Sequence, residues 1–249
     1  MEKYSILKKL GAGGFGSVFL AERTKDKQKV AIKCILLNRV EWYEKTFKIP
    51  TEVVILLRLK KLEGVSKILD HFTFAEYYCI VMEYYSGKDL FDYIVAKKRL
   101  SLEETKIITK RLVEILIELE KKNIYHNDIK DENIMISDEG KITLIDFGSA
   151  TIDGATPKGT FSGTRIYAPS EWIVNKLYNP KYATSWTIGL LLVTMLSGDT
   201  PFESDDDIVK GKYSLPIVVP DEIHALIKKC LAKNPCERPC LQEILKVLE

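Results

Sequence analysis

The stretch from residue 124 to residue 150 constrains the fold more than any other part of the sequence. It reads IYHNDIKDENIMISDEGKITLIDFGSA. Residues 134–136 and 141–145 are short runs rich in β-branched side chains, and the Ser-Asp-Glu-Gly segment between them, residues 137–140, has the composition of a turn. The pattern predicts a β-hairpin.

Two polar clusters flank this hairpin. Asp128, Lys130 and Asn133 form one cluster, and Asp146, followed by Phe147-Gly148, forms the other. Phosphoryl transfer uses these groups: one carboxylate orients a hydroxyl, the second carboxylate and the amide hold Mg²⁺, and the amine offsets charge that develops on the phosphate. The alternative is a polar β-turn in a domain of another kind.

The segments HNDIKDEN and DFG resemble the catalytic loop and the metal loop of a eukaryotic protein kinase. The resemblance implies an α+β, two-lobed fold in one domain over residues 1–249. A small β-rich N-lobe with one main helix would occupy about residues 1–84. A hinge near Tyr85 and a larger, mainly α-helical C-lobe would occupy about residues 85–249. ATP and Mg²⁺ are the cofactors that it implies.

A glycine-rich segment near the N-terminus fits this resemblance. The G-x-G-x-x-G spacing of Gly11, Gly13 and Gly16 also occurs in dinucleotide-binding folds, where it opens a helix. Here strand-like sequence, Val18 to Ala21, follows, so we expect the glycines to lie in a hairpin. The resemblance implies that this hairpin, with Leu10 and Val18, covers ATP.

Lys33 ends a β-branched run, Val30-Ala31-Ile32-Lys33, that is expected to be a strand. A solvated strand lysine is one interpretation. By resemblance, Lys33 bridges the α- and β-phosphates, and Ala31 lines the nucleotide site. We expect Lys33 to pair with Glu52, which lies on a predicted helix. Glu41 and Glu44 are alternatives.

The segment MEYYSGKDLF, residues 82–91, resembles the hinge. By resemblance Met82 guards the back pocket, and the Glu83 carbonyl and the Tyr85 amide bind adenine. Asp89 would begin the next helix and bind ribose hydroxyls or a substrate arginine. An N-cap role alone is also consistent with its position.

The second half of the chain has helical patterns. Ser101 and Glu104 form a predicted capping box for a helix that runs to about Lys122. Residues 186–196 are a nearly all-apolar helix of 11 residues, too short to span a bilayer. Residues 221–231 and 241–248 are predicted amphipathic helices.

The segment GTRIYAPSEWI, residues 163–173, resembles the platform that receives a peptide substrate. It implies that Thr164 lies against Asp128 and Lys130, and that Glu171 forms a buried ion pair with Arg238. Acidic residues favour substrates with basic residues before the Ser or Thr. Glu132 is the strongest candidate, and the others are Asp89, Asp131, Asp199, Glu203 and Asp205 to Asp207, of which the last three equally suit a solvated helix start.

Composition and charge limit the partners. Residues 1–84 carry a net charge of +5 and the remainder −3, which argues against nucleic acid and favours a basic peptide. The N-terminus lacks the apolar core of a signal peptide. The five cysteines are scattered without a zinc spacing, so free thiols in a reducing compartment are expected. We expect a monomer in the cytoplasm or also the nucleus, with no membrane partner.

Among kinases the chain most resembles the Pim family of serine/threonine kinases, through DIKDENI, LIDFGS, GTRIYAPSEWI and GDTPFESDDDI. It departs from the family pattern in three places. The hinge lacks the family's extra residue and proline, so two adenine hydrogen bonds are expected. Asn127 replaces the arginine that usually receives an activation-loop phosphate, and Thr184 replaces an aspartate under the catalytic loop.

The sequence therefore predicts a serine/threonine kinase in which Asp128 orients the hydroxyl and Lys130 steadies the γ-phosphate. Because Asn127 has no charge to pair with a phosphate, activity should not require phosphorylation of Thr156, Thr160 or Ser162. The alternative is a pseudokinase, a nucleotide-binding scaffold, suggested by Asn127 and Thr184. The peptide platform disfavours a small-molecule kinase.

Overall fold

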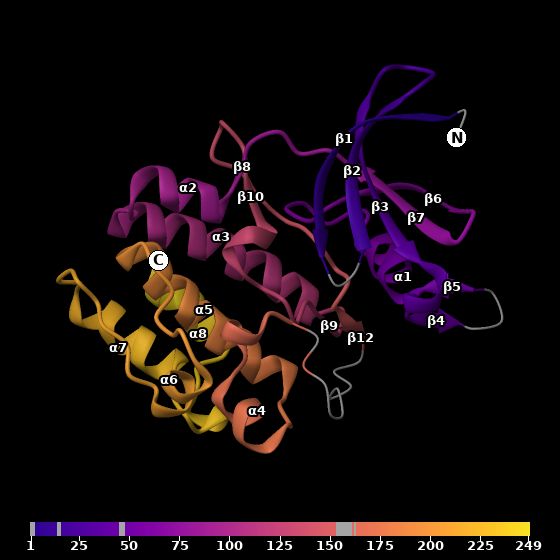
Figure 1. The fold of residues 1–249 in the computed structure, drawn as a ribbon. Helices are drawn as coiled ribbons and strands as arrows, with labels where there is room; N and C mark the ends of the chain where they lie inside the picture. The colour runs from indigo at the N-terminus through magenta and orange to yellow at the C-terminus, as the bar shows by residue number, and fades with distance from the viewer. Residues whose placement is uncertain (1–2, 14–15, 45–47, 153–160, 162) are drawn as a thin grey trace. The chain divides into compact units, whose positions relative to one another are not determined.

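The computed structural model describes residues 3–13, 16–44, 48–152, 161 and 163–249 (Figure 1). The predicted activation-loop residues Thr156, Thr160 and Ser162 lie outside the described residues. The chain divides into two compact units. Unit 1 comprises Met1–Ser86 with Asp146–Gly148, and unit 2 comprises Gly87–Ile145 with Ser149–Glu249.

Unit 1 is built on a five-stranded antiparallel sheet in the order β1-β2-β3-β7-β6. Its strands are β1 (Tyr4–Gly13), β2 (Gly16–Arg23), β3 (Lys29–Leu36), β6 (Ile68–Phe74) and β7 (Tyr77–Glu83). A 3₁₀ turn η1 (Leu37–Arg39), a short hairpin of β4 (Trp42–Glu44) and β5 (Ile49–Pro50), and helix α1 (Thr51–Arg58) connect β3 to β6. The glycine-rich segment thus joins two strands, as predicted.

The register of the sheet sorts its side chains onto two faces, because directly opposed residues share a face and neighbours along a strand alternate. Lys33 lies opposite Val18 and Ile80, and Ala31 lies opposite Met82, so these side chains share one face. Cys34, opposite Cys79, belongs to the other face.

Unit 2 is mainly helical. Its helices are α2 (Leu90–Lys97), α3 (Leu102–Glu120), α4 (Ser170–Asn175), α5 (Pro180–Ser197), α6 (Asp205–Lys210), α7 (Asp221–Cys230) and α8 (Leu241–Leu248). Its short strands are β8 (Lys88–Asp89), β9 (Ile124–Tyr125), β10 (Ile134–Ile136), β11 (Ile142–Leu144) and β12 (Thr151–Ile152), and its 3₁₀ turns are η2 (Asp131–Asn133), η3 (Arg165–Tyr167) and η4 (Pro235–Glu237).

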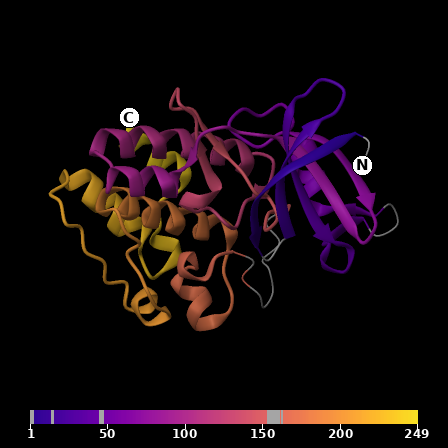
Figure 2. The ribbon, with the colours of Figure 1, turned by 45° about the horizontal axis from the view of Figure 1, so that its top comes forward.

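Helix α5 forms the centre of unit 2. It contacts α3 and α7, and α8 contacts both of those helices (Figures 1 and 2). Every residue from Trp186 to Leu196 is buried, which explains why this stretch is apolar on all sides. None of the helices in the described ranges is long and apolar enough to cross a membrane.

The predicted hairpin and helix starts are present. Strands β10 and β11 pair antiparallel, with Ile134 opposite Leu144. Ser101 caps α3: its hydroxyl accepts from the Glu104 amide at 3.2 Å, and the Glu104 carboxylate accepts from the Ser101 amide at 3.2 Å. Asp89 caps α2, and its carboxylate accepts from the Asp92 amide at 2.7 Å. The hairpin and these caps fix where the polar residues beside them lie.

Candidate active site

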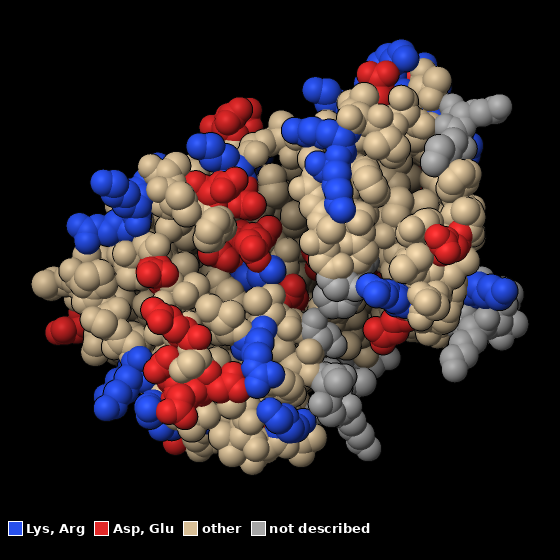
Figure 3. Space-filling model, viewed as in Figure 1, with Lys and Arg blue, Asp and Glu red and all other residues tan. Residues whose placement is uncertain are grey.

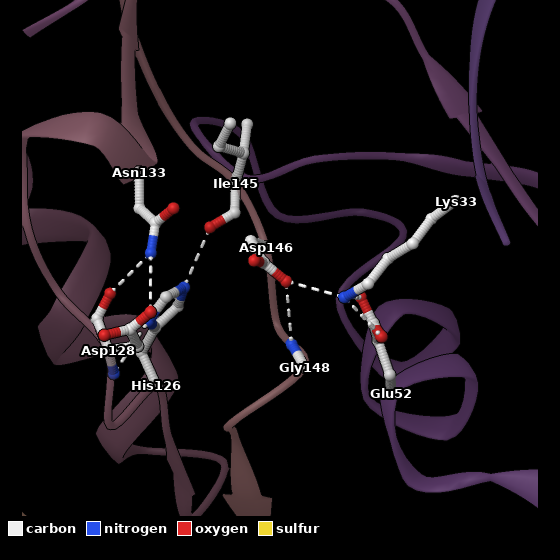
Figure 4. A network of polar contacts seen from close by, with 8 residues as sticks. All are labelled: Lys33, Glu52, His126, Asp128, Asn133, Ile145, Asp146 and Gly148. Carbon is white, nitrogen blue, oxygen red and sulfur yellow. Dashed lines mark hydrogen bonds and ion pairs between the residues drawn. The ribbon is translucent and has the colours of Figure 1, made fainter. Parts of the chain in front are cut away.

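The polar cluster of unit 1 centres on Lys33 of β3 (Figure 4). Its ammonium group lies 2.8 Å from both carboxylate oxygens of Glu52 on α1 and 2.7 Å from Oδ1 of Asp146. The predicted partner of Lys33 is therefore Glu52. Of the two alternatives, Glu41 is exposed and its carbonyl accepts from Thr51, while the side chain of Glu44 lies outside the described residues.

Burial and charge oppose each other in this cluster. Lys33 is 3% exposed and Glu52 is 6% exposed. Burial disfavours the charged form of Lys33, but attraction to Glu52 and Asp146 outweighs it and raises the pKa of the ammonium group. Burial also raises the pKa of Glu52, against the attraction of Lys33. The result is a fixed cation on the sheet face that also carries Val18, Ala31 and Met82.

Asp146 occupies an unusual backbone conformation. Its φ is 60°, in the left-handed region, which aspartate and asparagine tolerate better than other residues with a Cβ atom. The Gly148 amide donates to its Oδ1 at 3.2 Å. This tight turn and the ion pair to Lys33 hold the carboxylate in place, and such local strain is typical of functional sites.

The polar cluster of unit 2 centres on Asp128 (Figure 4). Oδ1 accepts from the Thr164 amide at 2.7 Å and from its hydroxyl at 2.9 Å. Oδ2 accepts from the Asn133 side-chain amide at 3.1 Å, and the same amide donates to the Asp128 carbonyl at 2.7 Å. Three hydrogen bonds thus orient a carboxylate that is only 7% exposed. The predicted contact between Thr164 and Asp128 is present.

His126 is a positioning residue that the sequence did not predict. It is 1% exposed, its Nε2 lies 3.0 Å from the Ile145 carbonyl oxygen, and its Nδ1 accepts from the Asp128 amide at 3.3 Å. The histidine therefore joins the Asp128 backbone to the end of the hairpin. The position of His126, two residues before Asp128, was the one sequence signal for this role. Its partner Ile145 lies 19 positions away and is brought close only by the fold.

Asn127 ties the catalytic loop to residues that follow the metal loop. Its side-chain amide donates to the Ser149 carbonyl at 3.1 Å and to the Thr151 hydroxyl at 3.0 Å. Residue 127 has φ 62°, a conformation that favours asparagine over most residues. Strand β12 pairs with β9 next to this contact, with Thr151 opposite Tyr125. The hydroxyl of Thr184 donates to the Pro180 carbonyl of its own helix at 2.9 Å.

The acidic residues of the catalytic loop differ in exposure. The Glu132 side chain is 55% exposed and forms an ion pair with Lys130. Asp131 is 5% exposed, and its carboxylate accepts from the Tyr167 hydroxyl at 2.9 Å. Burial raises the pKa of Asp131, while the hydrogen bond from Tyr167 opposes that shift. Asp131 therefore lies in an internal contact, whereas Glu132 is accessible.

The other residues expected at the nucleotide site lie along β1, β2 and β7. Leu10, Gly11 and Gly13 are exposed on β1, and Gly16 begins β2 with φ 121°. A Cβ atom there would lie 2.3 Å from the Cys34 carbonyl oxygen, so only glycine fits.

At the end of β7, the Tyr85 hydroxyl donates to the Glu83 carboxylate at 3.1 Å and accepts from the Lys67 amide at 3.2 Å. These bonds fix the side chains of the expected hinge. The binding of adenine by the Glu83 carbonyl and the Tyr85 amide stays a prediction.

The residues expected to hold Mg²⁺ have suitable chemistry. Asn133 directs its NH₂ group to Asp128, so its amide oxygen points away from that carboxylate (Figure 4). Asp146 supplies a carboxylate. No group of three or more His, Cys, Asp or Glu residues in the described ranges is arranged to hold a metal ion. Mg²⁺ in phosphoryl-transfer enzymes needs few protein ligands, because phosphates and waters complete its shell.

The predicted ion pair beneath the peptide platform is also present. The Arg238 guanidinium, whose side chain is fully buried, donates to both oxygens of Glu171 at 2.9 and 2.6 Å. It also donates to the Tyr182 and Ala232 carbonyls. This bidentate contact anchors α4 and the segment before it, which carries Thr164.

Comparison with known proteins identifies the family of this chain. The model of the protein kinase domain family matches residues 4–247. The chain belongs to the protein kinase family. A sheet-based unit 1 and a mainly helical unit 2 agree with the two-lobed fold class predicted from the sequence.

Relatives of this kinase have been described as serine/threonine kinases. Serine/threonine-protein kinase pim-2 of Danio rerio is 37% identical, and the alignment covers 98% of this chain and 84% of the relative. Serine/threonine-protein kinase prk-2 of Caenorhabditis elegans is 36% identical over 98% of this chain and 57% of the relative. Serine/threonine-protein kinase PSK2 of Saccharomyces cerevisiae is 33% identical over 97% of this chain and 23% of the relative. The Pim-like character inferred from the sequence is confirmed.

Proposed function

We propose that this kinase transfers the γ-phosphoryl group of ATP, with Mg²⁺, to Ser or Thr residues that follow basic residues, and that it does so without activation-loop phosphorylation. The observation that carries the proposal is the set of contacts on Asp128. A carboxylate has about four acceptor positions, and among the described residues Thr164 and Asn133 use three of them. One position remains for the hydroxyl of a substrate, already oriented by its neighbours.

The remaining residues have roles that suit their surroundings. Lys33, fixed by Glu52, would orient the α- and β-phosphates. Asn133 and Asp146 would hold Mg²⁺, and Lys130 would offset charge near the γ-phosphate. When bound, Mg-ATP supplies the phosphoryl group. Because each of these side chains is held before the substrate arrives, little free energy is spent on ordering them during the reaction.

Asn127 supports independence from phosphorylation. In a kinase with an arginine at this position, a phosphate on the activation loop supplies its partner. Here the shorter amide side chain reaches Ser149 and Thr151 directly. The start of the activation segment is thereby attached to the catalytic loop by neutral hydrogen bonds, which need no added charge.

Glu132 supports a preference for basic substrates, because its exposed carboxylate belongs to the same loop as Asp128. Asp89 is half-buried at the start of α2 and is a second candidate. Acidic side chains also gather over α6 (Figure 3). Local contacts occupy them, since Asp205 pairs with Arg165 at 2.5 Å and Asp206 with Lys210 at 2.8 Å. Asp205, Asp206 and Asp207 also lie in the first turn of α6, where acidic side chains suit a helix start, so we keep Glu132 and Asp89 for the substrate.

A nucleotide-binding scaffold remains the second candidate function, and Asn127 and Thr184 are the residues that favour it. The test uses phosphatase-treated protein, radiolabelled Mg-ATP, and two serine peptides that differ only in having Arg or Ala before the serine. The proposal expects transfer to the Arg peptide by the wild type and at least about tenfold less with the Ala peptide, equivalent to about 1.4 kcal/mol. It expects about 10²–10⁴-fold less transfer by Asp128→Asn. A wild type that shows no transfer, while ATP still raises its Tm, would establish the scaffold instead.

A further inference from the structure

Two cysteines of unit 1 lie side by side on the sheet face opposite Lys33. Cys34 of β3 and Cys79 of β7 are direct partners in the antiparallel register, and their sulfur atoms are 3.6 Å apart. Both are free thiols. Opposed residues in antiparallel strands have Cα atoms about 4.5–5.5 Å apart, within the range of about 4.4–6.8 Å that a disulfide requires. The backbone therefore already places the two residues at bridging distance.

A cavity gives small molecules access to this pair. It has a volume of about 320 Å³ and lies on the same face of the sheet. Besides Cys34 and Cys79, its lining includes the rings of Phe19, Phe74 and Tyr77, the last two of which are more than one third exposed at the rim. Cys34 is half-buried and Cys79 is 5% exposed. The thiols are thus sheltered from large reagents but open to a molecule the size of a peroxide.

The two thiols differ in acidity. The hydrogen bond between the two sulfur atoms lowers the pKa of Cys34, whereas the same contact, together with burial, raises the pKa of Cys79. The thiolate is the nucleophile in thiol oxidation. Cys34 is also the more exposed of the two thiols, so it is suited to react first and Cys79 to resolve the product, an arrangement typical of paired redox cysteines.

We propose that Cys34 and Cys79 form a dithiol site that hydrogen peroxide oxidises to a cross-strand disulfide, and that this disulfide lowers phosphoryl transfer. In the first step the Cys34 thiolate attacks one oxygen of the peroxide. The O–O bond breaks, the Cys34 sulfur becomes a sulfenic acid, and hydroxide leaves and takes up a proton as water. In the second step the Cys79 sulfur attacks the Cys34 sulfur. The S–S bond forms, the S–O bond breaks, and the hydroxyl leaves with the Cys79 proton as a second water.

The expected loss of activity follows from the position of Lys33, one residue before Cys34, and this part rests on the proposed function. The sulfur atoms must approach from 3.6 Å to about 2.05 Å. Rotation of the two side chains absorbs part of this movement, and β3 and β7 take up the rest. Lys33 makes three contacts of 2.7–2.8 Å from β3. Because a displacement of about 1 Å can cost about a hundredfold in rate, a fraction of that shift should lower activity about tenfold.

The test treats the reduced protein with hydrogen peroxide and maps the thiols by mass spectrometry. The proposal expects a product lighter by two hydrogen atoms, with the Cys34 peptide joined to the Cys79 peptide. Cys34→Ser and Cys79→Ser should each prevent this product. Cys236→Ser, at an exposed cysteine, is the matched control and should leave it unchanged. Oxidation of Cys236 or Cys240 while Cys34 and Cys79 stay reduced would overturn the site.

Activity is then measured on the oxidised protein. The proposal expects a loss of about tenfold that dithiothreitol reverses and that Cys79→Ser, which cannot form the bridge, does not show. A mapped disulfide with unchanged activity would overturn the regulatory part. A reduced wild type without any activity would instead contradict the proposed function, and the mapped disulfide would still decide whether the dithiol site exists.

Discussion

Replacement of Asn127 is the change that most directly separates this kinase from one that depends on phosphorylation. In Asn127→Gly the backbone keeps its φ of 62° without strain, and the two hydrogen bonds to Ser149 and Thr151 are lost. At about 1 kcal/mol for each net hydrogen bond, the attachment of the segment weakens by about 2 kcal/mol. That free energy corresponds to about a thirtyfold loss if only the attached state is active.

Asn127→Ala should lose more. Besides the same two hydrogen bonds, alanine pays about 1–2 kcal/mol for the left-handed conformation. The assay is peptide phosphorylation by phosphatase-treated protein, with the Tm recorded for each variant so that unfolding is not mistaken for inactivity. We expect the order wild type, Gly variant, Ala variant. If both variants phosphorylate the peptide as fast as the wild type, Asn127 does not hold the segment and the reasoning fails.

Three further predictions concern other contacts. Glu52→Gln, which keeps the shape but removes the charge that fixes Lys33, should lower kcat/KM for ATP about a hundredfold; steady-state kinetics test this, and an unchanged value would contradict the assigned role. Arg238→Met should lower the free energy of unfolding by about 3 kcal/mol, because Glu171 is left without its buried partner; urea unfolding measures it, and a change below about 1 kcal/mol would show that water replaces the arginine. Gly163→Ala would place a Cβ atom 2.4 Å from the Asn127 carbonyl oxygen and 2.8 Å from the Phe161 ring, so peptide phosphorylation and the Tm should both fall, and full activity would indicate that the loop adjusts.

Much of the fold could be predicted because its signals are local. The capping box of Ser101 and Glu104 and the turn before β11 depend on residues within a few positions of one another. The first residue of α5 was harder to predict from the sequence. The apolar run predicted a helix from Trp186, whereas α5 begins at Pro180 and is capped by Asn179. The residues between Pro180 and Trp186 include polar ones, so they carry no periodic apolar signal.

The site was predictable where the family motif names a residue and less so where a partner comes from elsewhere. The pairing of Lys33 with Glu52 could be proposed from a helical pattern and the resemblance. The burial of Asp131 could not, because its partner Tyr167 lies 36 positions away. Cys34 and Cys79 appeared scattered in the sequence, and only the register of β3 with β7 brings them together. The same holds for Asn127, whose partners follow the metal loop.

The central claim is that Asp128 orients the substrate hydroxyl in a kinase that is active without activation-loop phosphorylation. The most direct measurement is the single-turnover rate of phosphoryl transfer by unphosphorylated wild type and Asp128→Asn, with the Kd of Mg-ATP measured for both. The account predicts transfer by the wild type, a rate lower by about 10²–10⁴-fold in the variant, and the same Kd for each. Equal rates for the two proteins, or no transfer by a wild type that binds Mg-ATP, would contradict it.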